Sequence, residues 1–185
     1  MSAEQFTQIF RDEHRKVRDV LFDLIQAFDR RDPQRIGALL GEAASYAGPH
    51  FRYEEESLYP ALVEVFGRQY IEKLLHDHDR VIGTAARLVE LSGKQALSVD
   101  DVAEATELVR SILPHVSDCD GLSIMVERLP AATVQDILAT RERAWSENLE
   151  LFTWTSGVRT RPAVSAEQIA REYVATTAST SAQAR

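Results

Sequence analysis

Residues 50–60 read His-Phe-Arg-Tyr-Glu-Glu-Glu-Ser-Leu-Tyr-Pro. His50 and Glu54 are four residues apart, so on an α-helix both side chains project from one face, about one turn from each other. Glu54 continues the apolar stripe of its helix, whereas Glu55 and Glu56 step away from that stripe, although all three also fit an ordinary charged surface. A glutamate placed in this way can bridge two metal ions held by different helices.

One histidine recurs in an otherwise apolar seam on each of four expected helices, at positions His14, His50, His78 and His115. A single seam histidine is most often a core residue bonded to a neighbouring carbonyl group. Four buried imidazoles need many more partners, and a metal ion supplies them, since imidazole is its commonest ligand in proteins. The chain has one cysteine, so the metal has to be held mainly by histidine and carboxylate side chains.

The chain is expected to be all-α, because apolar residues recur at helical spacing in four long segments and no strand-like alternation occurs. Ser2 and Gln5 begin the first helix, which Asp32-Pro33 ends. The second ends at Gly67 with a kink at Gly48-Pro49, the third ends near Gly93, and the fourth runs from Ser98 to Pro130. This pattern predicts an antiparallel up-down four-helix bundle with an additional C-terminal helix and a flexible tail.

The expected domain organisation has three parts. Residues 1–130 form the bundle, residues 131–174 a helical extension and residues 175–185 a disordered tail. The extension is expected to contain a helix from about Thr133 to Leu151 and a short one from Ser165 to about Val174. Its aromatic residues, Trp145, Phe152 and Trp154, are expected to cover the bundle end or to form a homodimer contact.

The composition narrows the class of protein. The 185 residues include 29 acidic and 21 basic side chains, a net charge of −8, which disfavours nucleic-acid binding. No apolar stretch is long enough to span a bilayer, and residues 1–9 are expected to form neither a secretory signal nor a membrane anchor. The single cysteine suits a reducing compartment, so we expect a cytoplasmic protein with no membrane or nucleic-acid partner.

The residues that surround the histidines resemble those of the hemerythrin family, including its bacterial HHE cation-binding members. The resemblance covers about Phe6 to Leu129 and is most specific at residues 50–60. It implies a non-haem diiron centre bridged by an oxo or hydroxo group in an antiparallel four-helix bundle. In that centre His14 and His50 serve one iron, His78 and His115 serve the other, and Glu54 and Asp120 bridge the pair.

The third helix departs from the oxygen-carrying members of that family. They have a further histidine one turn before the ligand in this helix, where this chain has Leu74. His76 is two residues from His78, about 200° round the helix, so we expect it to face away and be solvated. The missing ligand is then replaced by a displaced residue or by a water molecule, which suits activation of a small molecule better than reversible oxygen storage.

Several other polar side chains are candidates near the site. Helical spacing places Cys119 on the face of His115, flanked by Asp118 and Asp120, so which of the three reaches the metal stays open; Cys119 itself is expected to be a small core residue. Tyr46, Tyr53 and Tyr59 lie nearby, and Tyr46 is expected to pack rather than to bind metal. Carboxylates that could accept N–H groups of the ligands are Glu13, Glu55, Asp77, Asp79 and Asp118.

Three functions fit this pattern. The first is a diiron protein that binds or senses O2, NO or iron. The second is a diiron enzyme that decomposes peroxide or reduces NO. Any electrons that it needs would come from a separate partner, because the chain has no obvious second redox motif or cysteine pair. The third is a bundle whose metal is only structural.

Overall fold

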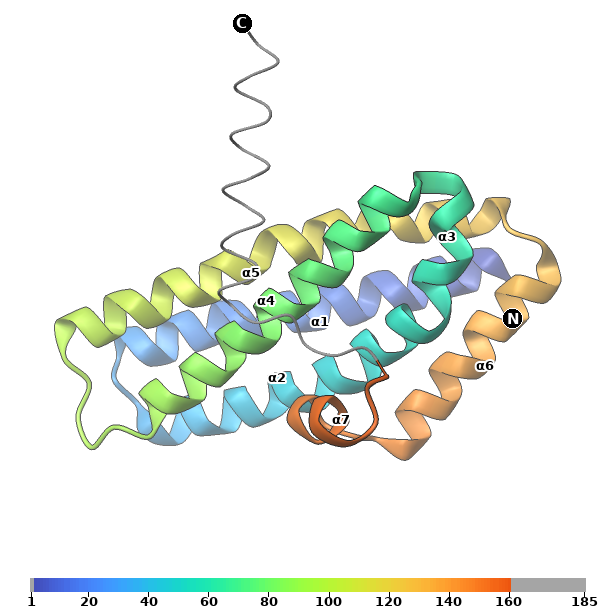
Figure 1. Cartoon of the computed structure of the whole chain (residues 1–185). Helices are drawn as coiled ribbons and strands as arrows, with labels where there is room; N and C mark the ends of the chain where they lie inside the picture. Colours follow the sequence, from blue (N-terminus) through green and yellow to red (C-terminus); the bar gives the residue numbers. More distant parts are fainter. Residues whose placement is uncertain (1, 161–185) are drawn as a thin grey trace, which may run out of the picture.

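The computed structural model describes residues 2–160, and every regular element in this range is a helix (Figure 1). The elements are α1 (Ala3–Asp29), α2 (Pro33–Tyr53), the π-helical η1 (Glu54–Leu58), α3 (Tyr59–Phe66), α4 (Arg68–Ser92), α5 (Val99–Met125), the 3-10 helical η2 (Val126–Arg128), α6 (Ala131–Glu147) and α7 (Leu151–Gly157). The expected all-α helical bundle is confirmed. The expected short helix at 165–174 and the tail at 175–185 lie outside the described residues.

The long helices lie side by side. Helix α1 packs against α2 and α5, and α4 packs against the same two helices (Figure 1). After η2 the chain turns back, so that α6 and then α7 both pack against α2. The segment that follows the bundle in sequence therefore lies along its side.

The helix ends form where local chemistry predicts them. The Ser2 hydroxyl accepts from the Gln5 backbone N–H, and the Gln5 side chain accepts from the Ser2 backbone N–H at 2.7 Å. Ser98 and Asp101 form the same reciprocal pair at the start of α5. Asp32 caps α2, whose first residue is proline.

The second expected helix contains a π-helical turn. Helix α2 continues through Gly48 and Pro49, and the irregular turn follows at η1, where the Tyr59 backbone N–H donates to the carbonyl of Glu54. This i to i+5 bond is the mark of a π-turn, a feature that often occurs at functional sites. Gly48 instead allows a close approach: a Cβ there would lie 2.7 Å from the Glu150 carbonyl carbon and 2.8 Å from the Leu151 nitrogen.

The expected helix from Thr133 to Leu151 is wrong at its C-terminal end. Helix α6 ends at Glu147 because Asn148 adopts the left-handed conformation, with φ of 47°. A separate helix, α7, then begins, with the Glu150 carboxylate accepting from the Thr153 backbone N–H at 2.6 Å. Sequence periodicity missed α7 because it is too short to show a stripe.

The core consists of two apolar clusters separated by the histidines. On α1, for example, Phe6 and Phe10 belong to one cluster and Val20 and Leu24 to the other, with His14 between them. Trp154 is 1% exposed and belongs to the second cluster, so the start of the extension completes the bundle core.

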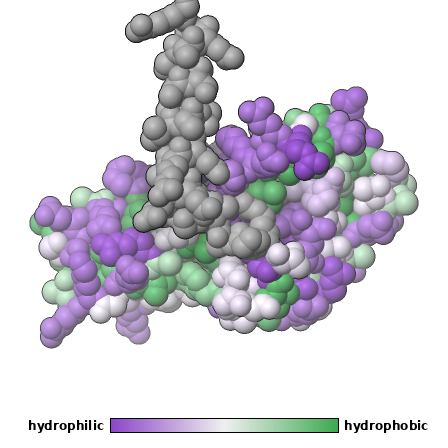
Figure 2. All heavy atoms as spheres, viewed as in Figure 1, coloured by the Kyte–Doolittle hydropathy of each residue, from purple (hydrophilic) through white to green (hydrophobic). Residues whose placement is uncertain are grey.

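The face in Figure 2 shows hydrophilic residues interspersed with smaller apolar areas. None of the helices within residues 2–160 is long and apolar enough to cross a membrane.

Candidate metal centre

The four seam histidines converge in the middle of the bundle. Each comes from a different helix, and none has more than 3% of its surface exposed. The Nε2 atoms of His14 and His50 face each other at 3.0 Å. The rings of His78 and His115 meet edge to face, with centroids 4.9 Å apart. The structure brings these four side chains together, as the sequence predicts.

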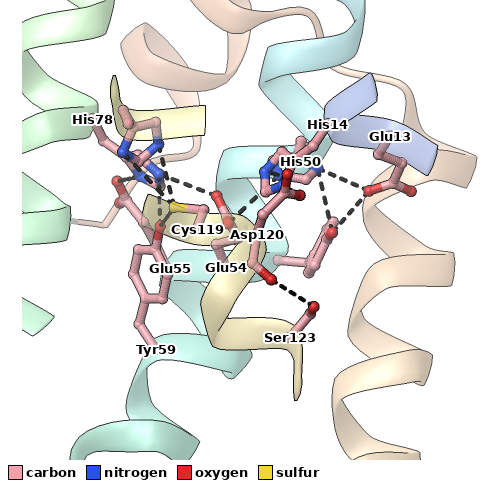
Figure 3. A network of polar contacts seen from close by, with 12 residues as sticks. Glu13, His14, His50, Glu54, Glu55, Tyr59, His78, Cys119, Asp120 and Ser123 are labelled. Carbon is pink, nitrogen blue, oxygen red and sulfur yellow. Dashed lines mark hydrogen bonds and ion pairs between the residues drawn. The ribbon is translucent and has the colours of Figure 1, made fainter. Parts of the chain in front are cut away.

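Glu54 lies between the two pairs of histidines (Figure 3). Its Oε1 is 3.5 Å from His50 Nε2 and its Oε2 is 3.1 Å from His78 Nε2. The side chain is fully buried, and neither oxygen has a partner with hydrogen-bond geometry. A buried carboxylate in this state is costly unless it is compensated by positive charge, so this side chain is suited to a cation.

Two groups of potential ligand atoms share Glu54 within the described range. One consists of His14, Glu54 and Cys119, the other of Glu54, His78 and His115, and in each group the ligand atoms lie within 4.8 Å of one another. A metal ion bound at about 2.0–2.3 Å holds its ligands roughly 3–4 Å apart, so both groups need only a small contraction to bind an ion. The donor set fits two metal ions with a shared carboxylate.

The pKa shifts of the site residues also favour a cation beside Glu54. Burial raises the pKa of Glu54, but the nearby His50 and His78 lower it well below its usual value. Burial lowers the pKa of His50, yet Glu54 and Glu13 raise it to about 10. Burial and the charge of His78 lower the pKa of His115 to about 3. A cation beside Glu54 would replace the positive charge of protonated imidazole, because metals bind the neutral ring.

Carboxylates fix the outer ring nitrogens of three of the histidines. The Nδ1 atoms and their carboxylate oxygens lie 2.8–2.9 Å apart in the pairs His14–Asp120, His50–Glu13 and His78–Glu55. Such contacts orient the ring and direct the other nitrogen toward the metal. Glu13 and Glu55 therefore lie where they can accept ring N–H groups of the candidate ligands, as the sequence predicts.

Asp120 and Cys119 differ from the arrangement that the family resemblance implies. Asp120 contacts His14 Nδ1 and lies 3.7 Å from Arg18, and its oxygens belong to neither ligand group. Cys119 is fully buried, and its Sγ is 3.7 Å from His115 Nε2 and 3.4 Å from the Tyr59 hydroxyl. The structure thus brings the thiol to the ligands, as the helical spacing from His115 favours.

The remaining carboxylate candidates lie farther out. Lys73 binds both Asp77 and Asp118, and Asp79 forms an ion pair with Arg159. The expected packing role of Tyr46 is seen in its edge-to-face contact with Trp145, with ring centroids 5.5 Å apart.

The place of the missing histidine is apolar. Leu74 is fully buried in a hydrophobic cluster. His76 is partly buried rather than fully solvated, and it belongs to neither ligand group. In this half of the site the Tyr59 hydroxyl lies 3.1 Å from His78 Nε2.

Two arginines that sequence reasoning missed also contact the carboxylates of the site. Arg141 binds Glu13, and Arg159 binds Glu55. Both arginines follow the bundle in sequence, more than 100 positions from their partners. No periodic pattern signals contacts of this kind.

A cavity of about 70 Å³ adjoins the histidines. His14, His50 and His115 contribute to its wall, and most of the rest is aliphatic, including Ala85 and Leu151. This volume exceeds that needed by one water molecule, and apolar cavities of this kind take up small apolar molecules. The cavity therefore connects the candidate ligands to a space suited to a small uncharged molecule.

The comparisons with known proteins agree with this geometry. The hemerythrin HHE cation binding domain family matches residues 5–122, which include the four seam histidines, Glu54 and Asp120. No curated protein and no solved structure gives a match. The matched region covers more than half of the chain and contains the candidate ligands, and we conclude that the chain belongs to the hemerythrin HHE cation-binding domain family.

Proposed function

We propose that this chain is a non-haem diiron protein that binds or senses O2 or NO in an antiparallel up-down four-helix bundle. His14, His50 and Cys119 would hold one iron, His78 and His115 the other, and Glu54 both. The observation that best supports this proposal is Glu54 itself, a fully buried carboxylate whose two oxygens face imidazoles of different pairs.

The chain's own residues favour a small, uncharged ligand. Bound iron would supply the redox chemistry of the site. The aliphatic wall of the cavity favours molecules that partition out of water. His14, His50 and His115 form part of the same wall, so a molecule in the cavity lies next to candidate ligands. Tyr59 is not part of this wall; its O–H group lies beside His78 and would donate to a molecule bound among the candidate ligands themselves.

Metal analysis and an optical spectrum of the protein expressed in air test the diiron proposal. We expect about two irons per chain and near-ultraviolet charge-transfer bands. Glu54→Ala should remove most of the iron, whereas His76→Ala, a histidine outside both ligand groups, should leave it bound. A colourless protein, or one that holds a single zinc ion, would contradict the proposal.

An enzyme that decomposes peroxide is the second candidate, and the Tyr59 hydroxyl favours it because proton transfer is part of that reaction. Two peroxide molecules give two water molecules and one O2, so no external electron donor is needed, whereas reduction of NO requires one. Oxygen release after addition of peroxide distinguishes this enzyme from a binding protein. Tyr59→Phe should slow the release and leave the iron content unchanged.

A further inference from the structure

The C-terminal segment, residues 131–160, lies beyond the part of the chain that matches the family and packs onto the bundle beside the metal centre. Its backbone at 149–151 approaches Gly48, two residues before the ligand His50. Leu151 lines the cavity next to the histidines, and Trp154 is buried in the bundle core. The segment is therefore part of the wall around the site.

Arg159 extends this wall to the outer nitrogen of His78. Its Nε and Nη2 atoms bind the two oxygens of Glu55 at 3.0 and 2.7 Å, and Glu55 accepts from His78 Nδ1 at 2.9 Å. The same Nη2 lies 2.7 Å from Asp79. The Arg159 side chain is 1% exposed and lies over the Trp154 ring, so its position is fixed from several sides. The two-point contact gives the Glu55 carboxylate a defined orientation.

Arg141 binds a carboxylate on the opposite side of the site, with a different geometry. Its Nε, at 2.8 Å, and its Nη2 both donate to the same oxygen of Glu13, Oε1. Glu13 accepts from His50 Nδ1 and from the Tyr53 hydroxyl, both at 2.8 Å. One ligand of each proposed iron is thus connected through a carboxylate to an arginine of the C-terminal segment.

The arginines help to hold these carboxylates in place. The Glu13 and Glu55 side chains are each 8% exposed. A buried carboxylate that loses a cationic partner is strongly disfavoured, so it moves toward water. The imidazole N–H then loses its acceptor, and the ring is no longer held with its Nε2 atom toward Glu54.

We propose that the C-terminal segment is a positioning element of the metal centre, in which Arg159 and Arg141 hold His78 and His50 in the metal-binding orientation. The proposal rests on the diiron function proposed above. Because coupling between two binding events is reciprocal, docking of the segment strengthens metal binding, and metal binding stabilises the docked segment. The metal content of the bundle can in this way be transmitted to a segment that the family match does not include.

Metal affinity of the folded full-length chain tests the role of Arg159. Affinity for Co²⁺ or Fe²⁺ is measured by competition with a chelator for the wild type, Arg159→Gln, Arg159→Lys and Arg143→Gln. Arg143 is the control for loss of an arginine on the same segment, since it forms a more exposed ion pair from α6 to Glu56, which pairs with Arg52 and belongs to neither ligand group. We expect Arg159→Gln to weaken binding about 10- to 100-fold. Arg159→Lys should recover part of the loss because it keeps the charge without the two-point contact, and Arg143→Gln should bind as the wild type does.

Two further measurements separate positioning from a merely structural role. The Co²⁺ absorption spectrum should change in Arg159→Gln but not in Arg143→Gln, because only the first alters a ligand's orientation. In the wild type, metal should slow hydrogen exchange of backbone amides at 149–158, a result that needs no variant to fold. This inference alone would be overturned if Arg159→Gln left the metal affinity and the spectrum unchanged. It would also be overturned if metal did not change hydrogen exchange at 149–158. A wild-type chain that binds no metal would overturn the diiron function and this inference with it.

Discussion

The ring of Phe51 stacks on the ring of His78, with centroids 3.8 Å apart and an interplanar angle of 9°. Phe51 also meets His115 edge to face at 5.7 Å and lines the cavity. One apolar side chain therefore supports both histidines of the second ligand group and forms part of the space next to them.

Phe51→Leu removes this stacked contact but keeps an apolar side chain. We expect a loss of about 1 kcal/mol in the free energy of unfolding, because an aromatic pair adds roughly 0.5–1.5 kcal/mol beyond its buried area. Urea unfolding of the metal-free protein measures it. Phe22→Leu is the control, since Phe22 is 48% exposed and should change stability by less than about 0.5 kcal/mol. Equal effects of the two substitutions would contradict the prediction.

The roles of Cys119 and Asp120 are separated by replacing each. Cys119→Ala should lower the metal content from about two ions per chain to about one and remove any thiolate absorption of the cobalt protein. Asp120→Asn should keep that absorption and weaken metal binding about 10- to 100-fold, because Asp120 acts on the outer nitrogen of His14. The reverse pattern would show that Asp120 is the ligand.

The close approach of residues 149–151 to Gly48 predicts that two glycine-to-alanine substitutions in α2 change the free energy of unfolding in opposite directions. Gly48→Ala places a Cβ against the backbone of residues 149–151, so we expect a loss of about 1–3 kcal/mol in unfolding free energy. Gly41→Ala, in the same helix with open space around it, should gain roughly 0.5–1 kcal/mol. Thermal unfolding of both variants checks the signs. A neutral Gly48→Ala would mean that the C-terminal segment does not dock as described.

Filling the cavity should impair ligand binding without removing metal. Ala85→Leu adds three carbon atoms to the aliphatic wall, and we expect affinity for NO to fall about tenfold. Ala139→Leu makes the same change at an exposed position of α6 and should have no effect. Titration of the iron-loaded protein with NO measures both. Undiminished binding in Ala85→Leu would show that the ligand does not use this space.

The lowered pKa of Asp101 predicts a loss of stability in acid. Its hydrogen bonds to Lys94 and Ser98 lower its pKa from 3.8 to about 2. Because the folded pKa is the lower one, this stabilisation is complete above the unfolded value and is lost as pH falls from about 4 to about 2. Urea unfolding should therefore show a gap between the wild type and Asp101→Asn that closes over this range. Asp100→Asn is the control for loss of one charge in the same turn, and a gap independent of pH would contradict the assignment.

The sequence predicts those features that depend on local chemistry. Ser2 with Gln5 and Ser98 with Asp101 begin helices because each pair satisfies backbone groups within one turn. The histidines also follow from helical periodicity, since a polar residue in an apolar stripe has to face the interior.

Other features depend on the folded chain. The approach of Arg159 to Glu55 spans 104 positions, and no local pattern of residues encodes it. Helical spacing from His115 favours Cys119, whereas the family resemblance implies Asp120, and only the folded chain shows which of the two lies among the candidate ligands. Helix α7 is formed by the left-handed Asn148 and the Glu150 cap, both of which are single-residue signals.

The π-turn at residues 54–58 changes the angular phase of the helix that contains it. Two side chains five positions apart in an α-helix point about 140° away from each other, since each residue adds about 100°. Glu54 and Tyr59 have this spacing, yet both lie 3.1 Å from the same atom, His78 Nε2. The wider turn brings them to one side. An ordinary α-helix through these residues would turn the phenol of Tyr59 away from the carboxylate of Glu54. The additional residue in the wider turn therefore allows one helix to present both groups to His78.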